Sequence, residues 1–468
     1  MNAMRVAIVI GTLSSALDAQ SGRVTGKASD PIFKVSRFDE TWPSAPRGAS
    51  PLRSLKHIDL LSDGSAWLTI GGSARARWMS YRNFQVSDAS AMQNDYTESR
   101  TILSADLRIA RPSGRYVRLF AEGRDAQGYG RTLPGGIRVN EADRSDWQNA
   151  LAEAGSGATF VRYGRQELSV GRERLVGVAD WMNARRSFEG WRGVSTVGAL
   201  RVDVFDGRVV AVRTLSPDRP DSTTHLRVAT AGSASERAAA RTFQPALWQS
   251  YAVDLETRNG LDRRVTAGVR SLWRTPLGRG VLSIEAEAAS QRGHLAGKTV
   301  DAWFGVLEAT TAWRAVRWSP SVMIGVDVAS GTGADSARHA DTFQPPYATA
   351  HAFNGIADVF GRGNLFEQRA GLGAEPFAAL QLQAVARRFA RVRIEDGVYT
   401  KTNSVMRAAG RSTARAVADE FDLTATMALG RYLQLQAGFA IVQPGAFLRE
   451  TGAAAQERFA VLGTAVTF

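Results

Sequence analysis

The chain has no cysteine, few lysines and histidines, and no long apolar run beyond its first residues. The absence of cysteine excludes disulfide bonds and thiol chemistry, so backbone pairing and packing must stabilise the fold. Because no later stretch reaches about 18 consecutive apolar residues, we expect no transmembrane helix. A barrel strand needs only about ten residues, of which every second one faces lipid, so a membrane protein built from strands fits this sequence.

Arginine carries the positive charge of the chain. The sequence holds 58 lysines and arginines against 45 acidic residues, and its lysines are Lys27, Lys34, Lys56, Lys298 and Lys401. The arginines recur singly along alternating segments instead of forming a basic tail or helix, which argues against nucleic-acid binding. A GC-rich genome, in which arginine is favoured over lysine, explains part of this bias towards arginine. A guanidinium group also binds carboxylates through two parallel hydrogen bonds, so anionic partners are expected.

The few histidines make an enzyme an unattractive hypothesis. Histidine occurs five times, mostly in segments that read as loops. None belongs to a recognisable nucleophile motif, and no His-x-x-x-His pair or acidic metal-binding pattern is present in the sequence. We therefore expect no catalytic residue, no metal and no cofactor.

The chain divides into three predicted regions. Residues 1–19 resemble a signal peptide, because Arg5 precedes the apolar run 6–13 and small residues lead to Ala19. Residues 20–65 are rich in proline, serine and arginine without a period, which predicts an extended periplasmic lead-in. Alternation begins near residue 66, and we interpret 66–468 as one all-β, transmembrane antiparallel β-barrel.

The alternation separates small apolar residues from charged ones. Ile70 and Trp78 share one face of the first segment, whereas Arg75 and Arg77 share the other. This pattern is typical of a strand that faces lipid outside and water inside. A soluble β-sandwich would bury a bulkier apolar face. Bacterial barrels of this kind have even strand numbers, so a register error or a missed strand would make the predicted number 18 instead of 16. The sixteen segments that alternate in this way are 68–79, 100–109, 117–124, 158–170, 186–197, 199–210, 247–258, 264–275, 280–292, 300–316, 317–330, 367–377, 378–394, 418–430, 431–443 and 456–468.

The remaining segments predict the loops and the end of the barrel. Long irregular stretches at 125–157, 211–246, 331–366 and 395–417 are expected as extracellular loops. The stretch 343–366 is aromatic and has few charges, so we expect it to fold into the lumen as a constriction or lid. The last strand ends at Phe468, which resembles the assembly signal of outer-membrane barrels.

The segment 161–192 is the densest cluster of charge. It contains seven arginines interspersed with Glu167, Glu173, Asp180 and Glu189. Excess positive charge in a narrow lumen raises the local concentration of anions. A structural ladder of ion pairs is the alternative interpretation of the same residues.

Several motifs together resemble the alginate export family of outer-membrane barrels. They are Gly164–Leu168, Glu173–Gly177, Asn183–Gly190, the opening strand Leu68–Trp78, the hairpin Arg100–Arg108 with Val117–Glu122, and the late loop His351–Asp358. The resemblance implies a monomeric barrel, with 18 strands favoured, that passes an anionic polyuronate through an arginine-lined lumen. Ser73, Ala76 and Met79 stand where that family often carries glutamates, which leaves the cargo open.

We expect successive arginines to act as weak sites along which a polyanion slides. Asp180 and Glu167 would orient the arginines. The early wall would be lined by Arg75, Arg77, Arg100, Arg108, Arg118 and Arg124, and the main selectivity zone by Arg162, Arg165, Arg172, Arg174, Arg185 and Arg186.

The expected setting is the bacterial outer membrane. Its lipid, an anionic polysaccharide or oligosaccharide, and a periplasmic secretion partner are the expected partners, and nucleic acid is not. The alternatives are an anion-selective uptake porin for small acidic sugars or other anions, and a structural or adhesion barrel without transport.

Overall fold

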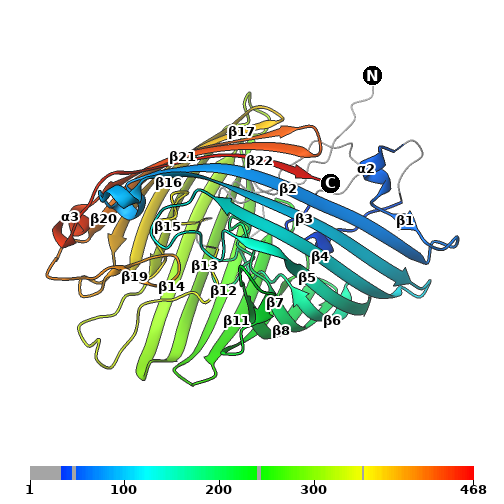
Figure 1. The fold of residues 1–468 in the computed structure, drawn as a ribbon, viewed down its shortest axis with the longest axis horizontal. Coiled ribbons are helices and arrows are strands. Elements are labelled where there is room, and N and C mark those ends of the chain that lie inside the picture. The colour runs from blue at the N-terminus through cyan, green and yellow to red at the C-terminus, as the bar shows by residue number, and fades with distance from the viewer. Residues whose placement is uncertain (1–32, 45–48, 240–243, 350, 352) are drawn as a thin grey trace.

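The computed structural model describes residues 33–44, 49–239, 244–349, 351 and 353–468. These residues form a closed antiparallel barrel of 18 strands (Figure 1). The predicted all-β barrel is therefore confirmed, with the favoured strand number, while the predicted signal peptide lies outside the described residues. In chain order the barrel strands are β2 (Ala66–Arg82), β3 (Asn94–Ala110), β4 (Arg115–Tyr129), β5 (Asp143–Ser156), β6 (Thr159–Gln166), β7 (Phe188–Val197), β8 (Leu200–Ala211), β10 (Thr224–Ser233), β11 (Leu247–Thr257), β12 (Asp262–Leu277), β13 (Gly280–Leu295), β14 (Lys298–Ala312), β15 (Ser321–Ala329), β16 (Leu365–Phe377), β17 (Leu380–Arg391), β20 (Ala416–Leu429), β21 (Leu433–Pro444) and β22 (Glu457–Thr467).

Each barrel strand pairs with its neighbours in sequence, and the last strand closes the barrel on the first. The register of β2 and β22 runs from Ser73 opposite Thr467 to Arg82 opposite Arg458. Short turns such as 198–199 and 378–379 alternate with long connections such as 167–187 and 330–364. Most short turns gather at one end, here the turn end, and most long connections at the other, here the loop end. In outer-membrane barrels the turn end faces the periplasm.

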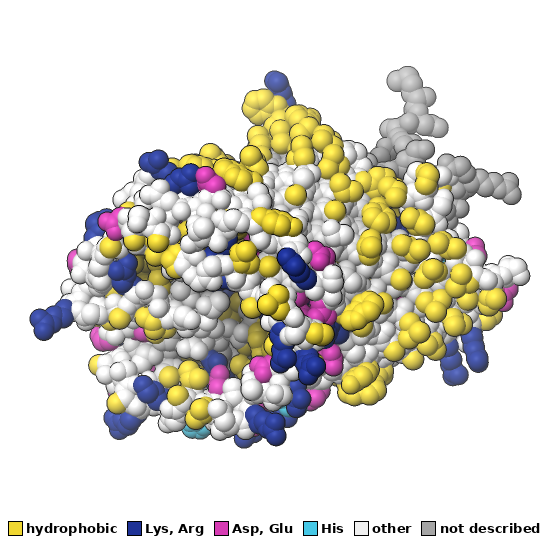
Figure 2. Space-filling view, in the orientation of Figure 1, with side chains coloured by type: hydrophobic (Ala, Val, Ile, Leu, Met, Phe, Trp, Pro, Cys, Tyr) yellow, Lys and Arg dark blue, Asp and Glu magenta, His cyan; other side chains and the backbone are white. Residues whose placement is uncertain are grey.

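The two faces of the barrel wall differ in chemistry. Large apolar side chains such as Leu103, Val269 and Leu372 are exposed on the outside, and Figure 2 shows apolar side chains spread over the strands. Charged side chains such as Arg118 and Glu287 are buried inside. The outer face therefore suits lipid, because a closed barrel satisfies every backbone hydrogen bond without water.

Two strands were not predicted, and both lie in segments that we expected to be loops. Strand β5 occupies 143–156, and β10 occupies 224–233. The outward positions of β5 include Ala152 and Ala154, so its apolar signal is weak, and a bulge opposite Glu122 and Gly123 breaks its period. Strand β10 turns Leu226 and Val228 inward, which reverses the expected polarity. The prediction of single loops at 125–157 and 211–246 was therefore wrong.

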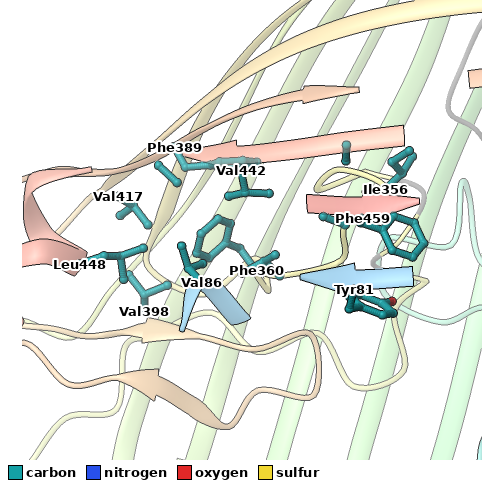
Figure 3. Close-up of a cluster of buried hydrophobic side chains, with 14 of the residues drawn as sticks. Tyr81, Val86, Ile356, Phe360, Phe389, Val398, Val417, Val442, Leu448 and Phe459 are labelled. Atoms are coloured by element: carbon teal, nitrogen blue, oxygen red, sulfur yellow. The ribbon is translucent and has the colours of Figure 1, made fainter. Parts of the chain in front are cut away.

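Loops fill much of the barrel interior with apolar clusters. At the loop end, Phe360 and Val398 from loops pack with Phe389, Val442 and Phe459 from the wall (Figure 3). A second cluster joins residues of 167–187 and Phe343 to the inner faces of β8, β10, β11, β13 and β14. The expected inward folding of 343–366 is therefore observed in the described part of that segment.

The other elements are short. Among the described residues, none of the helices has the length and apolar character needed to span a membrane. The minor elements are η1 (Arg37–Asp39), α2 (Pro51–Ser54), β1 (Ile58–Asp59), η2 (Phe84–Val86), η3 (Ser90–Met92), β9 (Arg219–Pro220), β18 (Val398–Tyr399), β19 (Val405–Arg407) and α3 (Ala446–Thr451).

Candidate functional site

The connection 167–187 between β6 and β7, here the crossing loop, spans the lumen. On one side its Arg185 lies 2.7 Å from Glu122 of β4. On the other side its Arg174 lies 2.8 Å from Glu285 and 2.5 Å from Glu287, both on β13. The order of strands around the closed sheet puts β4 and β13 on opposite sides of the barrel, so these ion pairs fix the loop across the lumen.

Asp180 is the centre of the arginine cluster on the crossing loop. Its carboxylate lies 2.7 Å from Arg100, 3.6 Å from Arg185 and 4.0 Å from Arg75. Burial raises the pKa of Asp180, but the three arginines outweigh burial and hold its pKa well below the ordinary value. The carboxylate therefore stays ionised while it contacts arginines of β2, β3 and the loop.

The arginines of β2 and β3 also hold the loop backbone. Arg75 donates to the carbonyl oxygens of Asp180 at 2.8 Å and Met182 at 3.1 Å. Arg77 donates to Glu98 at 2.6 Å and to the carbonyl oxygen of Trp181 at 2.7 Å. Arg75 and Arg77 share the inner face because side chains two residues apart along a strand point the same way.

The other wall arginines form ion pairs with nearby carboxylates towards both ends of the barrel. Towards the turn end, Arg108 and Arg118 lie 3.0 and 2.7 Å from Asp106, and Arg162 donates to Glu153 at 2.7 Å. Towards the loop end, Arg124 contacts Asp143 and lies 3.1 Å from Asp218, and Arg165 lies 3.3 Å from Asp146.

All twelve arginines of the predicted site contact groups inside the barrel, but they do not form one zone. The structure gathers Arg75, Arg100 and Arg185 around Asp180. Arg172 of the crossing loop reaches the far wall and lies 3.1 Å from Glu285 of β13. Arg186 donates to the carbonyl oxygen of Gly177 at 2.8 Å, and burial lowers its pKa to about 10. A role of these residues in binding cargo stays a prediction.

Glu167 links two elements inside the barrel. Its carboxylate lies 2.8 Å from Arg185 and accepts a hydrogen bond of 2.5 Å from the Ser36 hydroxyl. Burial raises the pKa of Glu167 to about 7, against the lowering effect of Arg185. The predicted pairing of Glu167 with an arginine therefore has a geometric counterpart.

Two adjoining cavities of about 80 Å³ each lie beside this cluster. Both are lined by Ser73, Arg100 and Asp180, together with Gln434 of β21 and Thr467 of β22. The Nε atoms of Arg75 and Arg100 are buried and have no hydrogen-bond partner among the described residues. Guanidinium, amide and hydroxyl groups together match the carboxylate and hydroxyl groups of an acidic sugar.

Sequence reasoning did not include several residues that line the interior. Gln434 and Gln436 line the cavities, and their alternation with leucines was a usable signal. A third cavity of about 20 Å³ is lined by Arg369 and Arg387 among others. Arg37 lines the cavity at the turn end, but it lies in the predicted lead-in, which has no period to show its direction.

One acidic group has the composition of a cation site. Among the residues that the structure describes, ligand atoms of Asp143, Asp146 and Asp218 lie within 4.8 Å of one another. Arg124 and Arg165 contact these carboxylates, and burial raises the pKa of Asp218 to about 6. We interpret the group as an ion-pair cluster that joins the 212–223 loop to the wall.

The closed barrel, with its apolar outside and charged inside, defines a channel protein of the bacterial outer membrane. The alginate export family matches residues 66–461, and the chain belongs to that family. Family and fold are those of transport porins. None of the curated proteins matches the chain.

Solved structures with the same fold come from Pseudomonas aeruginosa. OccK8 (OprE) is 11% identical with a TM-score of 0.58, and the match covers 86% of this chain and 98% of that one. OccK2 (OpdF) is 10% identical with a TM-score of 0.60, over 86% and 97% of the two chains. OpdK, solved with vanillate, is 12% identical with a TM-score of 0.58, over 85% and 99%. At these identities the likeness shows the fold alone.

Proposed function

We propose that this barrel passes an anionic polysaccharide or uronate oligosaccharide, of the alginate kind, along its arginine-lined interior. The observation that carries the proposal is the convergence of Arg75, Arg100 and Arg185 on one carboxylate beside the two polar cavities. One of these cavities is lined by Arg75, Arg77 and Arg100 but by a single carboxylate, that of Asp180. This excess of positive charge along the lining attracts anions into the lumen.

The arrangement supports stepwise passage. The arginines recur from Arg108 and Arg118 near the turn end, through Arg124 and Arg100, to Arg77 towards the loop end. Each already has a carboxylate or carbonyl partner, so a passing uronate exchanges one partner for another instead of filling a vacant strong site. Conduction requires sites that attract without trapping. A monomeric channel surrounded by outer-membrane lipid and supplied by a periplasmic secretion partner completes the proposal.

The test is the reversal potential of the purified protein in planar bilayers, with a salt gradient and a titration of oligouronate. We expect anion selectivity and block of the current by the oligouronate. The double variant Arg75→Gln with Arg100→Gln should lower both the selectivity and the affinity of the block. Arg292→Gln is the matched control, because Arg292 is exposed near the end of β13 at the loop end.

Selectivity that is equal in wild type and double variant would reduce these arginines to scaffolding and favour a general porin. A current that is carried equally by both ions in the wild type would contradict the proposal directly.

A second candidate is the uptake of small acidic sugars. The spaces beside Asp180 are small, about 80 Å³ each, and OccK2, which shares the fold, has been solved with glucuronate. Block by a monouronate at least as strong as block by an oligouronate would favour this candidate over polymer passage, because a polymer gains affinity from several linked contacts.

A further inference from the structure

Residues 33–44 lie inside the turn end of the barrel. Phe38 is buried and packs edge-on against Phe120 of β4 at 5.7 Å, in one apolar cluster with Leu151 of β5. The guanidinium group of Arg162 stands 4.5 Å from the centre of the Phe38 ring. In Figure 1 the short blue turn beside the β3 and β4 labels is this segment. An aromatic anchor therefore fixes it to the inner wall.

The backbone of this segment accepts hydrogen bonds from arginines of the proposed path. Arg118 donates to the carbonyl oxygen of Phe38 at 2.6 Å, Arg108 to that of Glu40 at 2.8 Å, and Arg185 to that of Val35 at 2.8 Å. Carbonyl oxygens thus occupy donors that would otherwise be open to the carboxylates of a polyanion.

The segment also closes on itself and on the end of the barrel. Arg37 lies 2.8 Å from Glu40 and donates to the carbonyl oxygen of Phe468 at 2.6 Å. The indole of Trp42 donates to Glu40 at 2.8 Å, and Lys56 stands 5.4 Å from the Trp42 ring. These contacts give residues 33–44 a defined fold beside β22, so the segment is more than a tether to the barrel.

The segment meets the crossing loop near the middle of the barrel. Ser36 donates to Glu167, and Val35 accepts from Arg185, which itself pairs with Asp180 and Glu122. A plug from the turn end and a loop from the loop end therefore share one arginine. Movement of either one changes the partners of that arginine, which couples the two obstructions.

We propose that residues 33–44 are an autoinhibitory plug. The plug is held by the Phe38 anchor and by the hydrogen bonds that its backbone accepts from arginines of the proposed path, and it is displaced when an anionic polymer competes for those arginine donors. The plug itself does not depend on the proposed function, but the polymer as its competitor does. Displacement is a competition for shared groups, so its extent depends on polymer concentration.

The first experiment removes the anchor in the full-length chain. Phe38→Ala should raise the open probability or the conductance of single channels at least about tenfold, the factor that corresponds to about 1.4 kcal/mol of lost packing. Phe38→Leu, which keeps an apolar anchor, should fall between Phe38→Ala and wild type. Leu61→Ala is the control, because Leu61 lies in the predicted lead-in but is 53% exposed.

The second experiment follows the plug directly. Benzoylphenylalanine in place of Phe38 should cross-link on illumination to peptides of β4 or β5, and added oligouronate should lower the yield in proportion to its concentration. A neutral oligosaccharide of the same length should leave the yield unchanged.

The outcomes separate the two proposals. If Phe38→Ala conducts as wild type does, the plug proposal is overturned and the segment is a permanent part of the wall. If the channel opens but the cross-link ignores oligouronate, displacement by a polyanion is overturned. If the opened channel shows no anion preference, the plug stands and the proposed function fails.

Discussion

Arg174 is expected to be the main electrostatic tie between the crossing loop and the far wall of the barrel. Its guanidinium group is almost completely buried and lies 2.8 Å from Glu285 and 2.5 Å from Glu287. Arg174→Met keeps a long apolar stem and removes the charge. Glu285 still contacts Arg172 and Arg270, each at 3.1 Å, whereas Glu287 keeps the hydroxyl of Tyr251 at 2.9 Å.

The cost of this variant follows from the carboxylate that it leaves behind. Breaking a buried ion pair by removing one partner costs about 3–5 kcal/mol. The docked loop should lose stability at the lower end of this range, because Glu285 retains two arginines. A loss of about 3 kcal/mol raises the population of the undocked loop by about two orders of magnitude.

A single engineered thiol measures that population, because the chain has no cysteine of its own. Val176 lies on the crossing loop and is 0% exposed, so Val176→Cys should react slowly with a maleimide while the loop is docked. Adding Arg174→Met should raise the labelling rate about a hundredfold, since labelling follows local opening. Glu287→Gln should recover part of the loss, because it removes the stranded charge.

Arg192→Met is the matched control. Arg192 forms a comparable ion pair of 2.7 Å with Asp203, but this pair joins two barrel strands, β7 and β8, and includes no residue of the crossing loop. This variant should change the labelling of the thiol by less than a few-fold. A labelling rate in Arg174→Met equal to that of its parent would refute the reasoning, and the apolar cluster of Leu168, Leu175 and Phe188 would then be what holds the loop.

Two further predictions concern lipid and pH. Leu307→Arg, on the outer face of β14 away from both strand ends, should lower the free energy of unfolding in bilayers by about 2–4 kcal/mol. Val197→Arg at the turn end should lower it by about 0–1 kcal/mol. Equal losses in denaturant titrations would contradict a lipid-facing surface. Burial lowers the pKa of His351 well below its ordinary value, with Lys401 and Arg77 adding to the effect, and its ring stacks on Trp181 at 3.7 Å. Docking of the 330–364 loop, which carries His351, is therefore fully stabilised above a pH of about 6.5 and weakens as the pH falls below it. Channel opening should therefore increase at acid pH in the wild type and not in His351→Phe.

The sequence was sufficient to predict most strands of the barrel wall but not the segments that fill the barrel. Along β2, alternation alone places Trp78 outside and Arg75 and Arg77 inside, because the pleat of a strand fixes both directions. The crossing loop has no such period. The pairing of Arg174 with Glu285, more than a hundred positions away in the chain, depends on how far the loop reaches, which local sequence does not encode.

The missed strands have a physical explanation of the same kind. Strand β5 presents alanines to lipid, and β10 presents Leu226 and Val228 to an apolar cluster inside the barrel, so neither shows the expected contrast. The segment 33–44 is missed for another reason: it is short and irregular, and its place is fixed by one aromatic anchor and by backbone carbonyls. Patterning of side chains carries no information about hydrogen bonds that the backbone accepts.

The way in which the interior arginines are paired favours a channel that opens by exchange of partners. Arg185 contacts Glu122, Glu167 and Asp180 and also holds the carbonyl oxygen of Val35. An unpaired guanidinium group at this depth would be costly in the closed state, and a fully neutralised one would offer nothing to a polyanion. Donors shared with a loop and a plug meet both demands, because they are satisfied at rest and become available when those segments move. If the plug and the crossing loop are fixed, the same ion pairs only stabilise the barrel. The mobility of the Phe38 anchor and of the Arg174 ion pairs therefore decides whether these arginines bind a passing polyanion or serve only a structural role.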